Sequence, residues 1–280
     1  MKKIKKIILI LIITITLTGC TLFKRDTMEN INIITTIYPI EYITNYIYGD
    51  NSNITSIYPD DIDTSIYTLT DKQYSDGSNK DLFIYIGKTD SDIAVELINR
   101  NKKLKLIDAT YGMEYKKDIT ELWLNPTNLL MISQNIKNGL NEYIDNSFLK
   151  QEINDKFNEL KLIISEVDAS YKTTIENANK KTIYTNSNAF LFLEKYGLEV
   201  IVVNKTHELF EKNLALLNNA IENNNVKYFF YLEDTEPDEE IKKHVEDDKL
   251  ITLEFRNLKN ITDSERNLKT SYEDLMKENL

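Results

Sequence analysis

Two groups of acidic residues have the chemistry to bind a cation. Asp60, Asp61 and Asp63 lie close together in the first half of the chain, and Glu233 and Asp234 are adjacent in the second half. Carboxylate oxygens are suited to hard cations such as Mn²⁺ or Ca²⁺. The alternative interpretation is a solvated acidic rim, because charged side chains usually face water.

Nitrogen and sulfur ligands are scarce, since the chain has two histidines and one cysteine. The single cysteine excludes an intramolecular disulfide and any metal site built from clustered cysteines. His244 falls among charged residues on an expected surface helix, where we expect it to be solvated. His207 follows an expected strand on a polar loop, from which a nearby cleft could recruit it. Gly-x-Ser-x-Gly, His-Glu-x-x-His and glycine-rich phosphate motifs are missing, so we do not expect an enzyme.

The N-terminus has the pattern of an exported lipoprotein. Four lysines precede an uncharged run over residues 7–18, which is shorter than the roughly 20 residues of a membrane-spanning helix. The run ends in Leu17-Thr18-Gly19-Cys20, which resembles a lipobox. We therefore expect a signal peptide over residues 1–19, lipid attachment at Cys20 and a polar tether over residues 20–30. The alternatives are an ordinary signal peptide with a chance cysteine, or an uncleaved anchor.

The charge of the chain narrows the choice of partners. Its net charge is −11, and cleavage of the lysine-rich leader makes the mature chain more acidic. An acidic surface argues against nucleic acid, because phosphate binding requires Lys and Arg. It is compatible with a cationic ligand. We expect a monomer that is lipid-anchored to the outer face of the cell membrane.

Short apolar runs alternate with helical patterns in each half of the chain. Continuously apolar strands are buried on both faces, so this order predicts an α/β fold of two lobes, each with a mainly parallel sheet flanked by helices. Strands are expected at residues 32–38, 53–58, 81–86, 104–108, 182–185, 199–203, 226–232 and 250–255. Helices are expected at residues 40–48, 91–99, 128–144, 147–177, 189–196, 210–223, 239–245 and 272–280, with a short helical turn at 71–75.

One long helix is expected to join the two lobes. Apolar residues keep a helical period from Phe148 to Tyr171, and neither Gly nor Pro interrupts them. A helix of about 30 residues spans about 45 Å. The predicted organisation is an N-terminal α/β lobe at 31–145, a linking helix at 146–179 and a C-terminal α/β lobe at 180–280.

The arrangement also predicts where a ligand binds. Open α/β sheets bind ligands outside the carboxyl ends of their strands, which here places the site in a cleft between the lobes. Besides the acidic residues, we expect Tyr38, Tyr67 and Trp123 as candidate cleft-lining side chains. The alternative for Trp123 is a place in the hydrophobic core.

Several segments resemble one protein family in their order and spacing. Residues 34–40 (ITTIYPI) are similar to the family's opening VTTFYPL, and residues 81–87 (DLFIYIG) to ADLFIYNG. Residues 123–126 (WLNP) are similar to HVWLDP, and residues 185–197 to TSHAAFGYLAKRYGL. Residues 43–49 are further similar to the family pattern A..IGGD, residues 226–230 to IKYIFTE and residues 276–280 to MMKYNL. The chain thus resembles the substrate-binding lipoproteins of zinc and manganese ABC transporters (cluster A-I), which include adhesin lipoproteins.

The resemblance implies a metal site whose ligands are mostly replaced. The family holds zinc or manganese with three His, or two His and a Glu, plus an Asp or Glu near the C-terminus. The equivalent positions here are Ser65, Glu121, Ser187 and Thr270. Only Glu121 is a good metal ligand, and the family's His-rich loop is missing from residues 75–79. Because zinc needs about four strong donors, we expect weak or absent zinc binding.

Two functions are compatible with these observations. The resemblance implies an extracytoplasmic solute-binding lipoprotein that captures zinc or manganese between its lobes and delivers it to an ABC permease. The alternative is a diverged paralogue without metal binding, which serves another solute or has a surface interaction or adhesion role.

Overall fold

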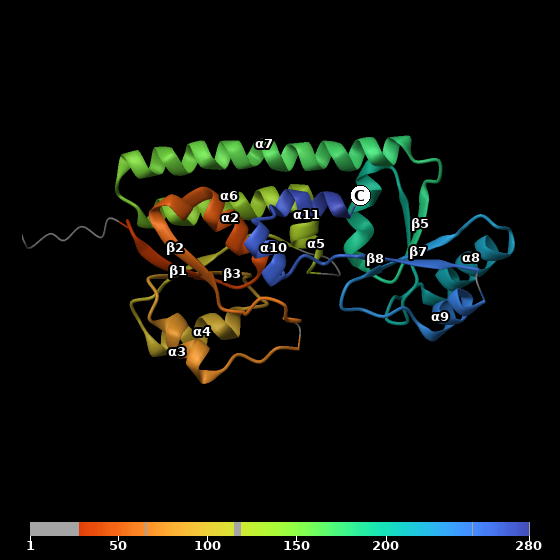
Figure 1. The fold of residues 1–280 in the computed structure, drawn as a ribbon, viewed down its shortest axis with the longest axis horizontal. Coiled ribbons are helices and arrows are strands. Elements are labelled where there is room, and N and C mark those ends of the chain that lie inside the picture. The colour runs from red at the N-terminus through yellow and green to blue at the C-terminus, as the bar shows by residue number, and fades with distance from the viewer. Residues whose placement is uncertain (1–27, 65, 115–118, 248, 280) are drawn as a thin grey trace, which may run out of the picture.

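The computed structural model describes residues 28–64, 66–114, 119–247 and 249–279, which form two α/β lobes beneath one long helix (Figure 1). Each lobe has a sheet of four parallel strands, which confirms the predicted fold class. The expected signal peptide, Cys20 and Ser65 lie outside the described residues.

The sheet of the N-terminal lobe has the strand order β2-β1-β3-β4, with β1 at Ile31–Thr35, β2 at Ser52–Ser56, β3 at Leu82–Tyr85 and β4 at Lys105–Asp108. The central strands are apolar on both faces, because each face packs against helices. Helices α2 (Tyr38–Tyr48) and α6 (Pro126–Tyr143) lie on one side, and α3 (Asp71–Ser78) and α4 (Ser91–Arg100) lie on the other (Figure 1).

The sheet of the C-terminal lobe has the order β6-β5-β7-β8, with β5 at Thr182–Thr185, β6 at Glu199–Val202, β7 at Tyr228–Leu232 and β8 at Ile251–Phe255. Helices α8 (Phe210–Glu222) and α9 (Glu239–Glu246) cover one face. Part of the other face is covered by η3 (Asn188–Tyr196), a 3₁₀ helix at the place where the sequence predicted a helix. Gly197 ends η3 with a φ of 97°, a left-handed conformation that glycine adopts without strain.

Helix α7 (Ser147–Asn177) has the bounds that the sequence predicts and runs along both lobes (Figure 1). Its N-terminus is capped by Asn146, whose side chain accepts from the backbone N–H of Phe148 at 2.9 Å. The apolar stripe of α7 is buried against α2, α6 and η3. Among the described residues, no helix combines the length and apolar composition needed to cross a bilayer.

The C-terminal segment returns to the N-terminal lobe after β8. Helices α10 (Asp263–Leu268) and α11 (Tyr272–Glu278) lie beneath α7 and beside α2 (Figure 1). The sequence analysis missed α10, η2 (Gly49–Asn51) and the single turn α5 (Glu121–Leu124), because each is too short to show a period. The return of the C-terminal segment brings residues of both lobes to one seam.

Candidate functional site

A cavity of about 240 Å³ lies between the lobes, and we call it the interlobe cavity. Its wall from the N-terminal lobe is the loop that follows β2, and its other walls are the segments that follow β7 and β8. It therefore opens at the carboxyl ends of strands, where α/β sheets bind ligands. The lining residues are Asp61, Ile62, Asp63, Thr64, Glu233, Asp234, Arg256, Asn257, Lys259, Asn260, Ile261 and Thr262.

Carboxylates outnumber cationic groups around the interlobe cavity. The structure brings the two sequence-distant acidic groups together there, with Arg256 and Lys259 as the lining cations. Glu233 is half-buried, and desolvation raises the pKa of its carboxyl group. Its Oε2 atom accepts from the backbone N–H of Asn257 at 3.0 Å, and the Asn257 amide donates to Asp234 Oδ2 at 2.6 Å. These bonds fix the carboxylates of the C-terminal lobe in place.

The backbone of the cavity wall is strained at two positions. Asp61 and Asp234 have φ values of 56° and 62°, in the left-handed region that residues other than glycine rarely adopt. Such strain persists only where surrounding contacts impose it, and it is common at functional sites. Here Asp61 is held by two bonds to the opposite wall, to the backbone of Ile261 and of Asp263.

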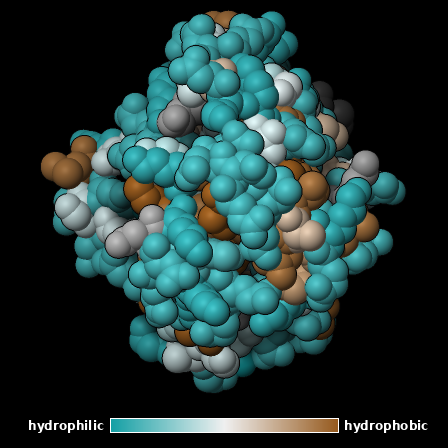
Figure 2. Space-filling model, turned by 90° about the vertical axis from the view of Figure 1, so that its right-hand side faces the viewer, coloured by the Kyte–Doolittle hydropathy of each residue, from teal (hydrophilic) through white to brown (hydrophobic). Residues whose placement is uncertain are grey.

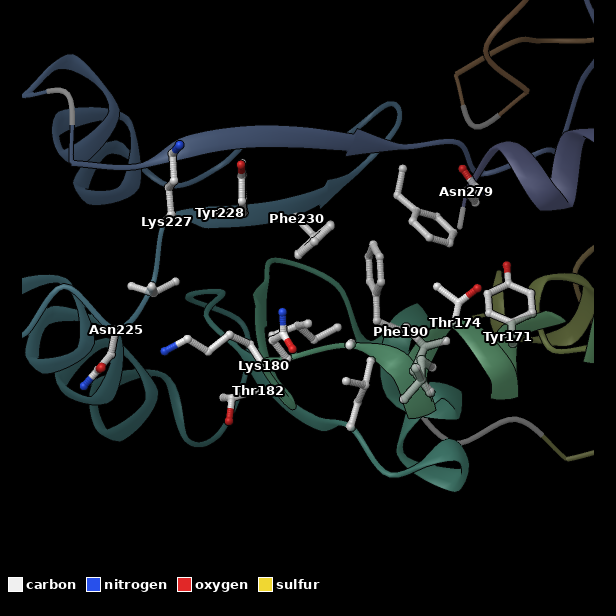
Figure 3. A pocket seen from close by; sticks show the side chains of 18 residues that line it. Tyr171, Thr174, Lys180, Thr182, Phe190, Asn225, Lys227, Tyr228, Phe230 and Asn279 are labelled. Atoms are coloured by element: carbon white, nitrogen blue, oxygen red, sulfur yellow. The ribbon is translucent and has the colours of Figure 1, made fainter. Parts of the chain in front are cut away.

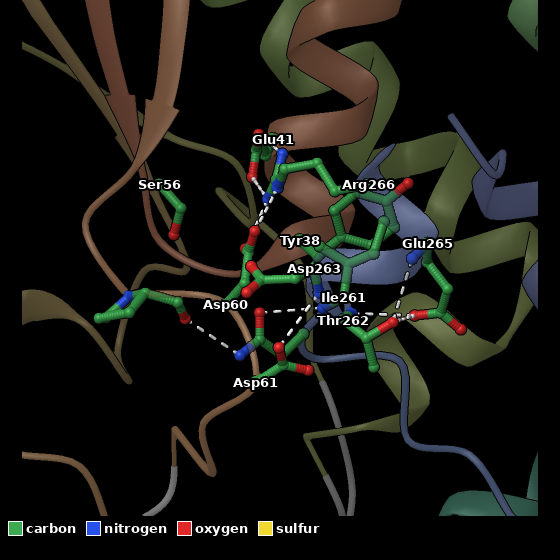
Figure 4. Close-up of polar contacts among 12 residues, drawn as sticks. Tyr38, Glu41, Ser56, Asp60, Asp61, Ile261, Thr262, Asp263, Glu265 and Arg266 are labelled. Carbon is green, nitrogen blue, oxygen red and sulfur yellow. Dashed lines mark hydrogen bonds and ion pairs between the residues drawn. The ribbon is translucent and has the colours of Figure 1, made fainter. Parts of the chain in front are cut away.

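Beside the cavity, Arg266 on α10 bridges two carboxylates of the N-terminal lobe (Figure 4). Its Nη2 atom lies 2.7 Å from Asp60 Oδ1, and its Nη1 and Nη2 atoms lie 2.7 and 3.0 Å from the oxygens of Glu41. Hydrogen bonds to Asp60 and Glu41 raise the pKa of the guanidinium further above its usual value. We call this arrangement the Arg266 clamp. It explains why Asp60 does not line the cavity, and no sequence pattern pointed to Arg266.

The aromatic candidates pack into the interior and do not line the interlobe cavity. Trp123 is 2% exposed, and its indole N–H donates to the Asn257 carbonyl at 2.7 Å. Tyr38 is buried beside Tyr272 and donates to the carbonyl of Thr270 at 3.2 Å. Tyr67 is half-buried and donates to Gln73 Oε1 at 3.1 Å. Burial of these large aromatic rings in the interior is more favourable than their exposure in a polar cavity.

The two histidines also lie elsewhere. His207 lines a separate shallow cavity with Lys205 and Glu208, and its Nδ1 atom accepts from the backbone N–H of Leu209 at 3.2 Å. His244 is half-buried on α9, with Nε2 at 2.8 Å from Asn218 Oδ1, so its expected solvation is wrong. The reason is that α9 packs beside α8, which carries Asn218.

Comparison with known proteins identifies the family. The family model described as zinc-uptake complex component A, periplasmic, matches residues 33–280. The chain belongs to this zinc-uptake family. The membership confirms the predicted resemblance to metal-type ABC substrate-binding proteins.

Relatives within and around the zinc-uptake family are distant in sequence. The high-affinity zinc uptake system protein ZnuA of Bacillus subtilis is 22% identical, over 90% of this chain and 86% of its own. The zinc-binding lipoprotein AdcA of Streptococcus pneumoniae R6 is 24% identical over 76% of this chain, which spans about half of AdcA's length, 48%.

Solved structures share the fold. The metal-dependent lipoprotein YcdH of B. subtilis has a TM-score of 0.72 at 20% identity, covering 89% of this chain and 96% of its own. The laminin-binding protein Lbp of Streptococcus pyogenes has a TM-score of 0.69 at 18% identity, covering 90% and 96%. At these identities the likeness shows the fold alone.

Three of the zinc-uptake family's four expected ligand positions fall on described residues. Glu121 is the first residue of α5, which packs against η3 across the seam. Ser187 is the N-cap of η3, and its hydroxyl accepts from the backbone N–H of Ala189 at 3.1 Å. Thr270 lies between α10 and α11, where its carbonyl accepts from Tyr38. The Ser187 hydroxyl thus caps a helix, and Thr270 contributes its backbone carbonyl to a contact with the N-terminal lobe.

The side chains at the expected ligand positions and around the interlobe cavity do not fit zinc. Serine and threonine hydroxyls are weak zinc ligands, and no histidine lines the interlobe cavity. Across the described ranges, no three His, Cys, Asp or Glu side chains are grouped closely enough to hold a metal ion. The oxygen donors that the cavity does offer are spread over opposite walls, so a cation would have to draw them together.

Proposed function

We propose that this protein is an extracytoplasmic solute-binding protein that captures a cation in the interlobe cavity and delivers it to an ABC permease. Membership of the zinc-uptake family supports this function, as do relatives named for zinc uptake and zinc binding. In this proposal Cys20 carries the lipid that holds the mature, monomeric chain at the outer face of the membrane. The protein has no catalytic role and binds no nucleic acid.

The proposed cargo is a hard divalent cation, for which Mn²⁺ is the probe. The observation that carries this proposal is the meeting of Asp61 and Asp63 with Glu233 and Asp234 around one cavity without imidazole. Carboxylate and carbonyl oxygens suit Mn²⁺ better than Zn²⁺, which favours nitrogen and sulfur donors. Because the carboxylates lie on opposite walls, binding of the ion would also draw the lobes together.

Calorimetric titration of the chelator-treated protein tests the cargo. We expect saturable binding of one Mn²⁺, and zinc binding weaker by roughly a hundredfold or more than that of B. subtilis ZnuA measured alongside. The variant Asp61→Asn/Glu233→Gln should lose Mn²⁺ binding, because it removes one carboxylate from each wall. Asp92→Asn/Glu222→Gln is the matched control, with the same change in charge at exposed positions that do not line the cavity.

Two results would overturn the proposed cargo. One is zinc binding as tight as that of the ZnuA reference, and the other is equal loss of Mn²⁺ binding in both double variants. The second would mean that the ion is held by the overall negative charge of the surface.

The Arg266 clamp favours a second candidate, the diverged paralogue without metal. A guanidinium already joins the loop after β2 to the C-terminal segment, so an internal cation links the walls beside the cavity. In that case neither Mn²⁺ nor Zn²⁺ binds at a defined stoichiometry, and the protein has a surface interaction or serves another solute. Absence of saturable binding for both ions in the titration is the result that selects this candidate.

A further inference from the structure

A second, larger pocket lies in the C-terminal lobe, and it is chemically unlike the interlobe cavity. We call it the C-lobe pocket. It has a volume of about 420 Å³, within the range of small-molecule sites. It lies between β5, β7, η3 and the C-terminal end of α7, on the sheet face opposite α8 and α9. The apolar side chains of its walls include Ile175, Ile183, Phe190, Leu193, Phe230 and Phe255.

The same sheet face remains apolar beyond the pocket. Tyr228 pairs in register with Ile251, and Phe230 with Leu253, so these side chains share one face of β7 and β8. Tyr228, Ile251 and Leu253 are 43%, 44% and 38% exposed. Seen from this end, the surface carries brown hydrophobic residues gathered among hydrophilic ones (Figure 2). A contiguous apolar patch on an otherwise acidic, polar chain indicates a binding surface.

Two lysines give this apolar pocket a charged end. Lys180 and Lys227 lie with Asn225 at one end of the pocket, and Phe190 and Tyr171 lie toward the other (Figure 3). Both lysines are exposed, and within the described part of the chain neither forms an ion pair with a carboxylate. The Nζ atom of Lys227 lies 5.5 Å from the centroid of the Tyr228 ring, whose residue also lines the pocket. Because the chain as a whole has a net charge of −11, these two lysines make the charge at this end of the pocket opposite in sign to that of the whole chain.

We propose that the C-lobe pocket binds a single-chain amphiphile with an anionic head, a long-chain carboxylate. The hydrocarbon chain lies along Phe190, Phe230 and Ile183, where its burial supplies most of the affinity. The carboxylate lies at the open end, within reach of the flexible side chains of Lys180 and Lys227, which supply specificity for a negative head group. The site is separate from the interlobe cavity and independent of the cation that we propose there.

Calorimetry with a set of twelve-carbon probes tests the proposal. Dodecanoate should bind one molecule per chain, and shortening it by two methylenes should weaken binding roughly tenfold. Dodecyltrimethylammonium, which has the same chain and a cationic head, should bind at least tenfold more weakly. Equal binding of both head groups, or no saturable dodecanoate binding, would overturn the proposal.

Charge variants test the role of the lysine pair. Lys180→Glu/Lys227→Glu should weaken dodecanoate binding at least tenfold, because it replaces attraction by repulsion. Lys161→Glu/Lys212→Glu makes the same change in net charge at two exposed helix positions and should leave binding unchanged. If both pairs weaken binding equally, the head group is not at this pocket.

A steric variant tests the position of the hydrocarbon chain. Ala178 lines the pocket just after the end of α7, in an extended conformation that any residue can adopt. Ala178→Trp should therefore abolish dodecanoate binding while the circular dichroism spectrum and melting temperature stay near those of the wild type. Asp61→Asn/Glu233→Gln should leave dodecanoate binding unchanged, so the two proposals can fail separately. A stable dimer that occludes the pocket and excludes dodecanoate would contradict the proposal.

Discussion

At the residue scale, the environment of a side chain decides its chemistry more than its type does. Asp90, just before α4, is 5% exposed, and its Oδ2 atom accepts from the backbone N–H of Ile86 at 3.0 Å. Burial raises the pKa of its carboxyl group to about 6, and the hydrogen bond from Ile86 only partly opposes this. The carboxylates of Asp61 and Asp63 were candidate ligands because of their type alone, whereas Asp90 had no sequence signal.

The raised pKa of Asp90 makes stability depend on pH. The unfolded chain loses this proton near pH 4 and the folded chain near pH 6, so the folded state binds more protons in between. The free energy of unfolding therefore falls as pH rises through this window, by about 2–3 kcal/mol from this group. Urea denaturation from pH 4 to pH 7 should show a flatter profile for Asp90→Asn than for the wild type.

The control for that prediction is Asp92→Asn, two residues further along and exposed in the first turn of α4. Its profile should run parallel to that of the wild type. If Asp90→Asn also runs parallel, the buried carboxyl group does not titrate as we infer.

At the element scale, the lobes depend on close approaches between helices and sheets. Helix α6 contacts β4 at Gly139, where a Cβ atom would lie 2.8 Å from Cγ1 and from Cγ2 of Ile107. Real Cβ atoms do not approach so closely, so glycine allows the helix to lie against the strand. The sequence predicts both elements, but the requirement for glycine comes from their packing.

Gly139→Ala should destabilise the protein although alanine is the better helix former. The gain in helix propensity is about 1 kcal/mol, and overpacking costs about 1–3 kcal/mol, so a net loss of roughly 1 kcal/mol is expected. Urea denaturation measures it. In the double variant Gly139→Ala/Ile107→Ala, the added methyl group fills the space that the smaller residue at 107 vacates. The double variant should therefore lose less free energy of unfolding than the sum of the losses of the two single variants. Simple additivity of the two changes would show that no clash exists.

At the scale of the whole molecule, the C-terminal segment joins the lobes. Arg266 contacts Asp60 and Glu41, which lie 206 and 225 residues earlier, and Tyr42 donates to Glu273 at 2.5 Å. Glu41 is 3% exposed, and the Arg266 guanidinium is its ion-pair partner. The long helix α7 runs along both lobes, and the Arg266 clamp fastens the C-terminal segment to the N-terminal lobe.

Arg266→Gln should cost about 2 kcal/mol in the free energy of unfolding, because it leaves the buried carboxylate of Glu41 without its cation. Adding Glu41→Gln should recover part of that loss. Arg100→Gln is the matched control, since Arg100 also pairs with two carboxylates, Asp71 and Glu96, but both are exposed. Its loss should stay below about 1 kcal/mol. Equal losses at the two arginines would mean that the clamp is no stronger than a surface ion pair.

The sequence by itself determined the order of the strands and of the longer helices, the parallel sheets and the extent of α7. These features follow from hydrophobic period and from stop residues such as Gly197, which act over a few neighbouring positions. It also determined that imidazole ligands are scarce, because the chain has two histidines and neither stands at one of the four expected ligand positions.

Only the tertiary structure decided which side chains meet. It brought Asp61 to Glu233 and Asp234, placed Trp123 in the core and set Arg266 between Asp60 and Glu41. It also formed the C-lobe pocket between β5, β7, η3 and α7 and left the neighbouring apolar face of β7 and β8 exposed. The physical reason is that such contacts join residues far apart in the chain, and their energies depend on burial and geometry that leave no period or spacing in the sequence.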